Sequence, residues 1–405
     1  MGLLALAVAL GGCSGKRDHV EPPAKLTDIQ ASFTPREAWS ASIGSADGSG
    51  LLSLAPFVAE GLVVAVDTRG QVSAHDAASG ALRWRSEVGF AVSGGVGGGM
   101  GLVLVNGRRG ELAALDLATG EPRWRVETGS LAYAPAVVGA GRVALRGADG
   151  RLLVLDAANG ERLWADTRPV PPLSLQGTGR PLLLEDAVIA GFDNGEVGAY
   201  ALANGRKLFT VTVALPGGRS EVERMVDVDS TPLLDRGVIY ALAYQGRLVA
   251  IDAATTQTLW GRELSGFSDL AQDRGALYLT DARGAVMAVD KRSGKSLWTQ
   301  DALLHRGVTG PALADGMVVV GDREGYLHWL SAEDGRLLAR LRPVSSALTG
   351  APRTDGERLY VQGRDGRLVA VSANNAVGNG VGSPQGDTRR AEPKDEFRRP
   401  TPSTP

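Results

Sequence analysis

The residue with the most specific chemistry is Cys13, the only cysteine among 405 residues. An apolar and glycine-rich run precedes it, and Leu10-Gly-Gly-Cys13 has the small residues that a lipoprotein signal peptidase accepts before the thiol that receives the lipid. We therefore predict a signal peptide over 1–12, lipidation of Cys13 and a lipidated polar tether over 13–34. The residue after the cysteine is Ser14 and not aspartate, which favours sorting of a bacterial lipoprotein to the outer membrane. No Lys or Arg precedes Cys13, which leaves a start codon further upstream and an atypical signal as two open explanations.

The chain lacks the residue patterns that common enzyme classes require. Its histidines have no cysteine partners and no metal-ligand spacing; they are His19, His75, His305 and His328. Residues 139–144 match the glycine pattern of a dinucleotide-binding loop, but the residues that follow predict a strand instead of a helix. No Gly-x-Ser-x-Gly elbow occurs. We therefore predict a protein that is not an enzyme, with no catalytic residue, no bound cofactor and no metal site.

Two segments have the composition of a protein-docking site. Residues 171–177, Pro-Pro-Leu-Ser-Leu-Gln-Gly, present apolar side chains in a frame stiffened by proline, and residues 221–229 are acidic. Apolar contacts supply affinity, whereas charges steer and orient a partner. The alternative is that these segments only cap one end of the fold. Asp227 and Asp229 also suggest calcium, but two carboxylates supply too few oxygen ligands.

Both segments lie within a repeat that extends over most of the chain. Eight turn glycines mark it, at Gly70, Gly110, Gly150, Gly195, Gly246, Gly284, Gly325 and Gly366. Fourteen positions after each of the first seven stands an aromatic residue or, once, alanine: Trp84, Trp124, Trp164, Phe209, Trp260, Trp298 and Ala339. Pairs such as Asp149-Gly150 favour two-residue hairpin turns, and an Asp-x-x-x-Gly turn follows in many repeats. Each repeat therefore predicts four strands.

Four-stranded units with a period of about 40 residues bury their faces only by stacking on one another. We predict an all-β, eight-bladed β-propeller of four-stranded antiparallel blades over 35–372, in which each outer-strand tryptophan packs between blades. The last repeat lacks its fourth strand, and Trp39 lies on a spare strand. Residues 35–42 are therefore expected beside 350–372, so that the N-terminal strand closes the ring. Residues 373–405, rich in Gly, Pro, Arg and Asp, predict a disordered tail.

The two candidate docking segments fall where the repeat is longest. The intervals from Gly150 to Gly195 and from Gly195 to Gly246 exceed the others, and the extra residues lie at 169–180 and 215–230. Insertions on one face of a repeat fold are typical of its binding face, so we expect these two loops to be neighbours. The net charge of −2, without a dense basic stripe, argues against nucleic acid as a partner.

The Asp-x-x-x-Gly-x-x-x-Trp repeat resembles that of quinoprotein dehydrogenase propellers. Together with Leu10-Gly-Gly-Cys13, the length and the two loops, the chain is similar to the BamB family of outer-membrane assembly lipoproteins over residues 35–372. The most specific stretches are 171–177, 221–232 and 237–246. This resemblance implies a non-catalytic scaffold on the periplasmic face of the outer membrane. It would bind the POTRA domains of a BamA-like barrel subunit, with unfolded barrel precursors as further partners.

The same resemblance implies which residues contact the partner: Leu173, Leu175, Gln176, Arg224, Asp227 and Asp229. Gln176 stands where the family often has arginine. Two other functions are open on the same repeat. A quinoprotein enzyme would need a calcium-bound quinone and, in that family, adjacent cysteines, whereas this chain has a single cysteine. A propeller lipoprotein that mediates adhesion is the other alternative.

Overall fold

The computed structural model describes residues 21–44, 53–175, 177 and 179–373, and all regular structure in these ranges is β-strand. Cys13 and Gln176 lie outside the described residues, as do the proposed signal peptide and tail. Within the described part of the chain, no helix has the length and apolarity that a membrane span requires.

The strands fall into four classes by their order within the repeat. The first strands are β2 (Phe57–Ala59), β6 (Gly97–Gly99), β10 (Val137–Gly139), β14 (Leu182–Leu183), β18 (Leu233–Asp235), β22 (Ala271–Gln272), β26 (Ala312–Ala314) and β30 (Arg353–Thr354). The second strands are β3 (Leu62–Val66), β7 (Leu102–Asn106), β11 (Arg142–Arg146), β15 (Ala187–Gly191), β19 (Val238–Leu242), β23 (Ala276–Thr280), β27 (Met317–Gly321) and β31 (Leu359–Gln362).

The third strands are β4 (Gln71–Asp76), β8 (Glu111–Asp116), β12 (Arg151–Asp156), β16 (Glu196–Ala201), β20 (Arg247–Asp252), β24 (Val286–Asp290), β28 (Leu327–Ser331) and β32 (Arg367–Ser372). The fourth strands are β5 (Leu82–Glu87), β9 (Pro122–Glu127), β13 (Arg162–Thr167), β17 (Lys207–Thr212), β21 (Thr258–Glu263), β25 (Ser296–Gln300), β29 (Leu337–Leu341) and, from the other end of the chain, β1 (Arg36–Ser42).

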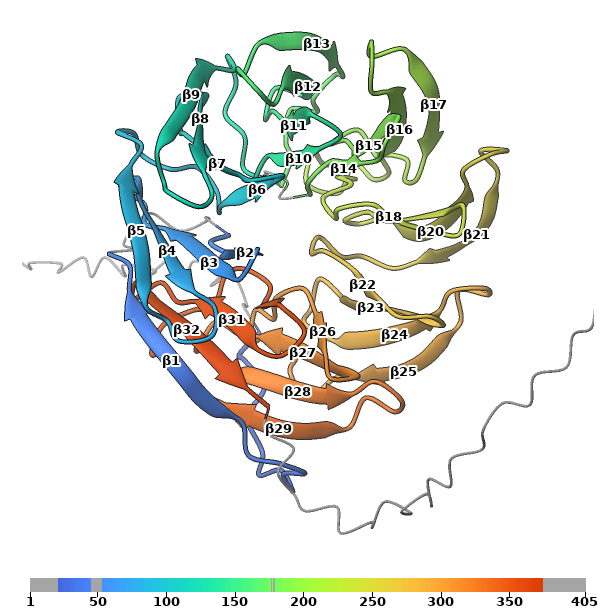
Figure 1. Ribbon diagram of the computed structural model, residues 1–405. Coiled ribbons are helices and arrows are strands. Elements are labelled where there is room, and N and C mark those ends of the chain that lie inside the picture. Colours follow the sequence, from blue (N-terminus) through green and yellow to red (C-terminus); the bar gives the residue numbers. More distant parts are fainter. Residues whose placement is uncertain (1–20, 45–52, 176, 178, 374–405) are drawn as a thin grey trace, which may run out of the picture. The chain divides into compact units, whose positions relative to one another are not determined.

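Each repeat forms a four-stranded antiparallel sheet, the unit expected of a propeller (Figure 1). Two of these sheets are joined in one eight-stranded sheet by a single parallel bridge, Val137 to Gly98. The last sheet has the order β1-β32-β31-β30, with Trp39 opposite Ala370. Residues 36–42 therefore lie beside residues 367–372, as the sequence predicts.

The hairpin and Asp-x-x-x-Gly turns have the local chemistry that their residues predict. In the second turn of the first repeat, Asp76 Oδ1 accepts hydrogen bonds from the N–H and the hydroxyl of Ser79, at 2.9 and 2.8 Å. Gly80 has a φ of 75°, a left-handed conformation that disfavours residues with a Cβ. Such turns position the fourth strand and its tryptophan.

Six tryptophans pack against the next sheet, which confirms the predicted wedge. Trp84 is one example: its Nε1 donates a hydrogen bond to Leu117 O at 2.8 Å, and its ring lies on Gly120. Trp39 makes the same contact with Ala77 O at 2.9 Å and with Gly80 of the first sheet. The other four are Trp124, Trp164, Trp260 and Trp298. The remaining tryptophan, Trp329, is buried in β28 and contacts Phe33.

The apolar core is divided among the spaces between consecutive sheets. One cluster joins β3 and β4 to β7 and β8 through residues such as Val64, Val72 and Leu115. Another joins the last sheet to the first through Trp39, Tyr360 and Val63. Further clusters of the same kind join other pairs of consecutive sheets.

Part of the proposed tether packs on the sheets. Ala24 N donates to Leu304 O at 2.9 Å, Ser32 N donates to Leu338 O at 2.7 Å, and Phe33 is buried against Trp329. We call residues 21–34 the N-terminal strap. Sequence reasoning predicts only a polar tether here. The composition of the segment does not reveal the contacts that its backbone and Phe33 make.

Candidate functional site

The two long loops contact each other beside the hairpin turns of their sheets. We call residues 169–180 the knob loop and residues 215–230 the acidic loop. The knob loop connects β13 to β14, and the acidic loop lies between β17 and β18. Leu175 N donates to the carboxylate of Asp227, and Arg180 N donates to Thr231 Oγ1 at 3.0 Å. The expected neighbourhood of the loops is therefore present.

A buried arginine lies at the centre of this contact. Arg146 ends β11, and its Nη2 lies 3.0 Å from Oδ1 of Asp193 and 3.0 Å from Oδ1 of Asp229. Its Nη1 donates to Gly191 O at 2.8 Å and to Val228 O at 3.1 Å. The guanidinium thus joins the end of β11 to the β15–β16 turn and to the acidic loop.

Gly177 of the knob loop packs directly on this ion pair. A Cβ added to Gly177 would overlap Asp229 Oδ1 and Arg146 Nη2. The close approach therefore requires glycine, and it places the knob loop against the buried charges.

Asp227 fixes the knob loop from the other side. Its side chain is fully buried and accepts the Leu175 N–H, while its backbone carbonyl accepts from Tyr244 N at 2.8 Å. Oδ1 of Asp227 has no hydrogen-bond partner among the described residues. One aspartate thereby connects the knob loop, the acidic loop and the β19–β20 turn.

Two carboxylates of this cluster have raised pKa values. The pKa of Asp227 is raised to about 7, mainly by burial and also by the neighbouring Asp229 and Asp193, against the opposing Leu175 N–H and Arg146. Burial also raises the pKa of Asp229 to about 6, although Arg146 opposes the shift. Burial lowers the pKa of Arg146, but Asp193 and Asp229 outweigh it and leave a net rise. The cluster has more negative charge than one guanidinium neutralises.

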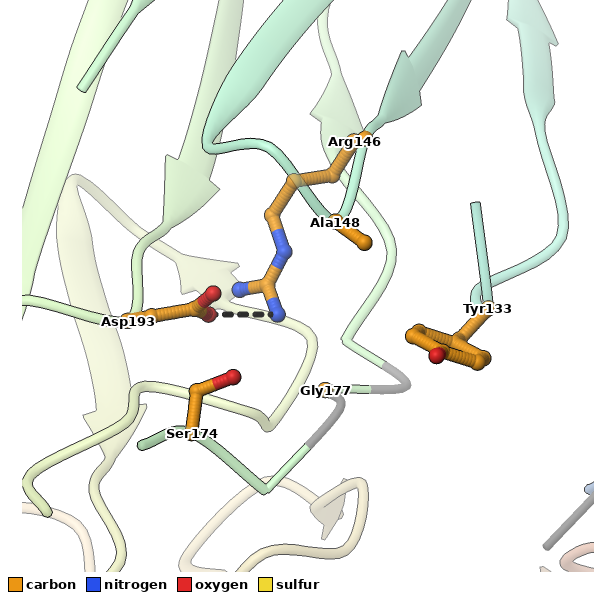
Figure 2. A pocket seen from close by; sticks show the side chains of 7 residues that line it. Tyr133, Arg146, Ala148, Ser174, Gly177 and Asp193 are labelled. Atoms are coloured by element: carbon orange, nitrogen blue, oxygen red, sulfur yellow. Dashed lines mark ion pairs between the residues drawn. The ribbon is translucent and has the colours of Figure 1, made fainter. Parts of the chain in front are cut away.

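A pocket of about 180 Å³ opens beside the cluster. Figure 2 shows Arg146 between Asp193 and Tyr133, with Ser174 and Gly177 of the knob loop nearby. Gly147 and Ala148 of the β11–β12 turn complete the lining. The pocket is polar, and the knob loop forms one of its walls.

Some of the contact residues that the sequence predicts are exposed, and others are buried. Leu173 is 43% exposed, Leu175 is half-buried, and Arg224 is exposed in a turn of the acidic loop. Sequence reasoning expects Asp227 and Asp229 to be surface charges, but they are 0% and 2% exposed. Two carboxylates in an irregular loop give no sign in the sequence of which neighbours enclose them.

Arg146, Asp193 and Ser174 were not predicted. A signal for Arg146 exists, because it stands four residues before its turn glycine, where the other repeats have uncharged residues: Val66, Asn106, Gly191, Leu242, Thr280, Gly321 and Gln362. Asp193 belongs to an Asp-Asn-Gly motif that is typical of a hairpin turn, so the sequence does not distinguish it as a site residue. The pairing of the two follows only from the stacking of consecutive sheets.

The surface formed by these loops has several exposed apolar side chains. Leu215 is 80% exposed and Val222 is 55% exposed on the acidic loop, and Leu173 projects from the knob loop. Phe267, on the next connection along the chain, packs against Tyr244 and is also exposed. Apolar residues supported by a rigid polar cluster are suited to binding another protein.

The chain matches the family model described as outer membrane protein assembly factor BamB over residues 68–300 and 288–378. It is 45% identical over 370 residues to the outer membrane protein assembly factor BamB of Pseudomonas aeruginosa, an alignment that covers 91% of this chain and 97% of that protein.

Two solved structures show the same kind of fold. The crystal structure of BamB from Moraxella catarrhalis superposes with a TM-score of 0.77 at 28% identity and covers 84% of this chain and all of that one. A europium-containing methanol dehydrogenase superposes with a TM-score of 0.69 at 13% identity over 84% of this chain and 93% of its own. The dehydrogenase is similar in fold alone.

Proposed function

Since the chain belongs to the family of the outer membrane protein assembly factor BamB, we propose that it is a non-catalytic scaffold of the outer-membrane β-barrel assembly machinery. Its relatives carry the name of an assembly factor, and the quinoprotein dehydrogenases are far more distant. The contact between the knob loop and the acidic loop is the observation on which the proposal mainly rests.

We propose that the protein acts from the periplasmic face of the outer membrane. Lipidation of Cys13 after removal of residues 1–12 would anchor it there, and residues 13–34 would lead from the lipid to the sheets over 35–372. Residues 373–405 would extend from the last sheet as a tail. Mass spectrometry of the mature N-terminus tests the cleavage site and the acyl chains together.

The proposed partner is a BamA-like barrel subunit, bound through its POTRA domains. The exposed Leu173 and Arg224 would contact it directly, together with Leu175 and Gln176 of the knob loop. Asp227 and Asp229 would act from the interior, because their side chains hold the knob loop in place. Unfolded barrel precursors would be further partners of the assembled machinery.

The decisive experiment measures binding of purified POTRA domains to the wild type and to Leu173→Asp. We expect at least about tenfold weaker binding by the variant, because a charge replaces an apolar contact at the centre of the interface. Leu163→Asp is a matched control, since Leu163 is 40% exposed on β13 and lies outside the loops. Equal binding by the wild type and Leu173→Asp would contradict the proposed docking site.

We also propose that the eight four-stranded units form one closed ring. Two observations support this: the pairing of β1 with β32, and the apolar cluster between the last sheet and the first. Radial closure would leave only short, protected strand edges. A rigid ring would hold both loops at a constant distance from the lipid anchor.

A further inference from the structure

The three buried aspartates beside Arg146 carry more charge than the protein neutralises. Asp193, Asp227 and Asp229 are at most 6% exposed, and among the described residues Arg146 is the cation that pairs with Asp193 and Asp229. When all four groups are ionised, the cluster has an excess of two negative charges. Buried charges are ordinarily paired, protonated or bound to a metal ion. One divalent cation would supply the positive charge that the ionised cluster lacks.

The orphaned oxygen of Asp227 is an independent sign of a missing ligand. Oδ1 of this fully buried side chain has no hydrogen-bond partner among the described residues. Nearly all buried polar atoms in proteins have a partner in the protein, in water or in a bound ion. The oxygen therefore needs a partner that the described chain does not supply.

The separation of the carboxylates fits calcium. One oxygen from each of Asp193, Asp227 and Asp229 lies within 4.8 Å of the other two. Two oxygens on one calcium ion lie at most about 5 Å apart, because each Ca–O distance is about 2.3–2.6 Å. Magnesium, with Mg–O distances of about 2.0–2.1 Å, sets a tighter limit on this separation and demands near-ideal octahedral geometry, so calcium suits an irregular set of aspartates better.

The adjoining pocket can supply the remaining ligands. Calcium takes about six to eight oxygens, including water. The pocket of about 180 Å³ has room for several water molecules, and Ser174 and Asp193 line it (Figure 2). The pocket therefore gives solvent and ions access to the cluster from the side of Asp193.

We propose that Asp193, Asp227 and Asp229 bind one calcium ion beside Arg146. The ion neutralises the cluster and connects the β15–β16 turn to the acidic loop. Through the Leu175 N–H bond to Asp227 it also fixes the knob loop. The binding site itself does not depend on the proposed docking function, although the fixed loop is the one assigned to docking.

Calorimetric titration of the full-length protein in detergent, after treatment with EDTA and removal of the chelator, tests the site. We expect one calcium ion per chain with a Kd of roughly 10⁻⁵ to 10⁻³ M, weaker binding of magnesium, and a Tm that rises with calcium concentration. Absence of both heat and a Tm shift at about 10 mM calcium, well above that range, would overturn the proposal. This titration does not involve POTRA domains. A negative result would therefore contradict the calcium site and leave the docking proposal unaffected.

Asp193→Asn and Asp227→Asn locate the ion. Each replacement preserves the shape of the side chain and removes one charge, so we expect calcium to bind at least about tenfold more weakly. Asp186→Asn is the matched control, because Asp186 is an exposed aspartate in the β14–β15 turn of the same sheet. If both variants fold and bind calcium as tightly as the wild type, the ion lies elsewhere and the assignment is refuted. If a variant does not fold, the wild-type titration decides whether the protein binds calcium.

Discussion

At the scale of single residues, the contact between each fourth-strand tryptophan and a glycine of the next sheet explains the constant spacing of the repeat. The indole ring lies flat on a glycine with positive φ, as Trp84 lies on Gly120. The hydrogen bond from Trp84 Nε1 to Leu117 O fixes the ring in this position. The spacing from the turn to the tryptophan is therefore constant because the indole ring must reach the glycine of the next sheet.

Gly120→Ala should destabilise the protein much more than Gly101→Ala. Both glycines have a φ of 75°, so the backbone strain of about 1–2 kcal/mol is common to both variants. Only at Gly120 would the new Cβ overlap the Trp84 ring, whereas nothing lies within 4 Å of it at Gly101. We expect an additional loss of about 1–3 kcal/mol for Gly120→Ala. Urea unfolding measures the difference, and equal losses would show that the ring is free to move.

Arg146→Met should strongly destabilise the protein. It leaves Asp193 and Asp229 buried without their cation, which costs about 3–5 kcal/mol in comparable buried pairs. Arg83→Met is the control, because Arg83 pairs with Asp76 at the surface, where such pairs contribute about 1 kcal/mol or less. Chemical denaturation in calcium-free buffer makes the comparison, and similar losses for both would contradict the buried charge cluster.

The sequence predicts the residues that recur but not those that depart from the repeat. Trp39 could be assigned to the last sheet because the last repeat lacks its fourth strand and Trp39 lies on a spare strand. The burial of Asp227 and its bond to Leu175 could not be predicted, because they depend on how two irregular loops fold against each other. Turn and strand patterns encode local structure, whereas the charge cluster is a product of tertiary packing.

At the scale of elements, the N-terminal strap is held by a largely buried charge network that joins the β25–β26 connection, the β27–β28 turn, β28 and β29. Arg306 donates to Ala24 O at 3.0 Å, and Arg340 donates to Thr27 O at 3.1 Å. His328 connects the two arginines, since it pairs with Asp322 at 3.0 Å and its Nδ1 accepts from Arg340 Nε at 3.3 Å. Asp322 in turn accepts from Arg306 Nε at 2.8 Å. The strap therefore depends on a neutral histidine.

Acid should loosen the strap by protonating His328. Burial lowers the pKa of His328 from 6.5, and the nearby Arg340 and Arg306 lower it further, against the opposing Asp322. The folded state therefore binds this proton less tightly than the unfolded state. The stability that neutral His328 contributes is fully present above pH 6.5 and is lost as the pH falls. The loss in the free energy of unfolding is at most about 1.4 kcal/mol per pH unit.

His328→Gln isolates this effect from the other titrating groups. Glutamine can donate to Asp322 and accept from Arg340, but it cannot take up the proton. The free energy of unfolding should therefore fall more steeply in the wild type than in the variant between pH 7.5 and 5.5. Hydrogen exchange at residues 24–32 should report the same difference locally. Parallel pH profiles would rule out His328 as the titrating group.

At the scale of the whole molecule, the two ends of the described chain stabilise each other through one sheet. Within it, β1 supplies the fourth strand to β32, and Trp39 packs on Gly80 and bonds to Ala77 of the first sheet. The strap precedes β1 and packs on a different sheet, where Phe33 meets Trp329. Removal of the strap and removal of β1 should therefore have different consequences, although both shorten the same end.

Three truncations separate the two contributions, with the protein beginning at residue 21, 35 or 44. Loss of residues 21–34 removes Phe33 and the backbone bonds of the strap, so a moderate fall in Tm is expected. Loss of residues 35–43 as well exposes the edge of β32 and uncovers the apolar cluster of Tyr360, Leu368 and Ala370. Unpaired strand edges next to apolar surface associate with one another, so only the shortest protein should self-associate in sedimentation experiments. If the proteins that begin at 35 and 44 have the same Tm and both stay monomeric, β1 does not close the ring, and the proposed eight-bladed closed propeller is wrong.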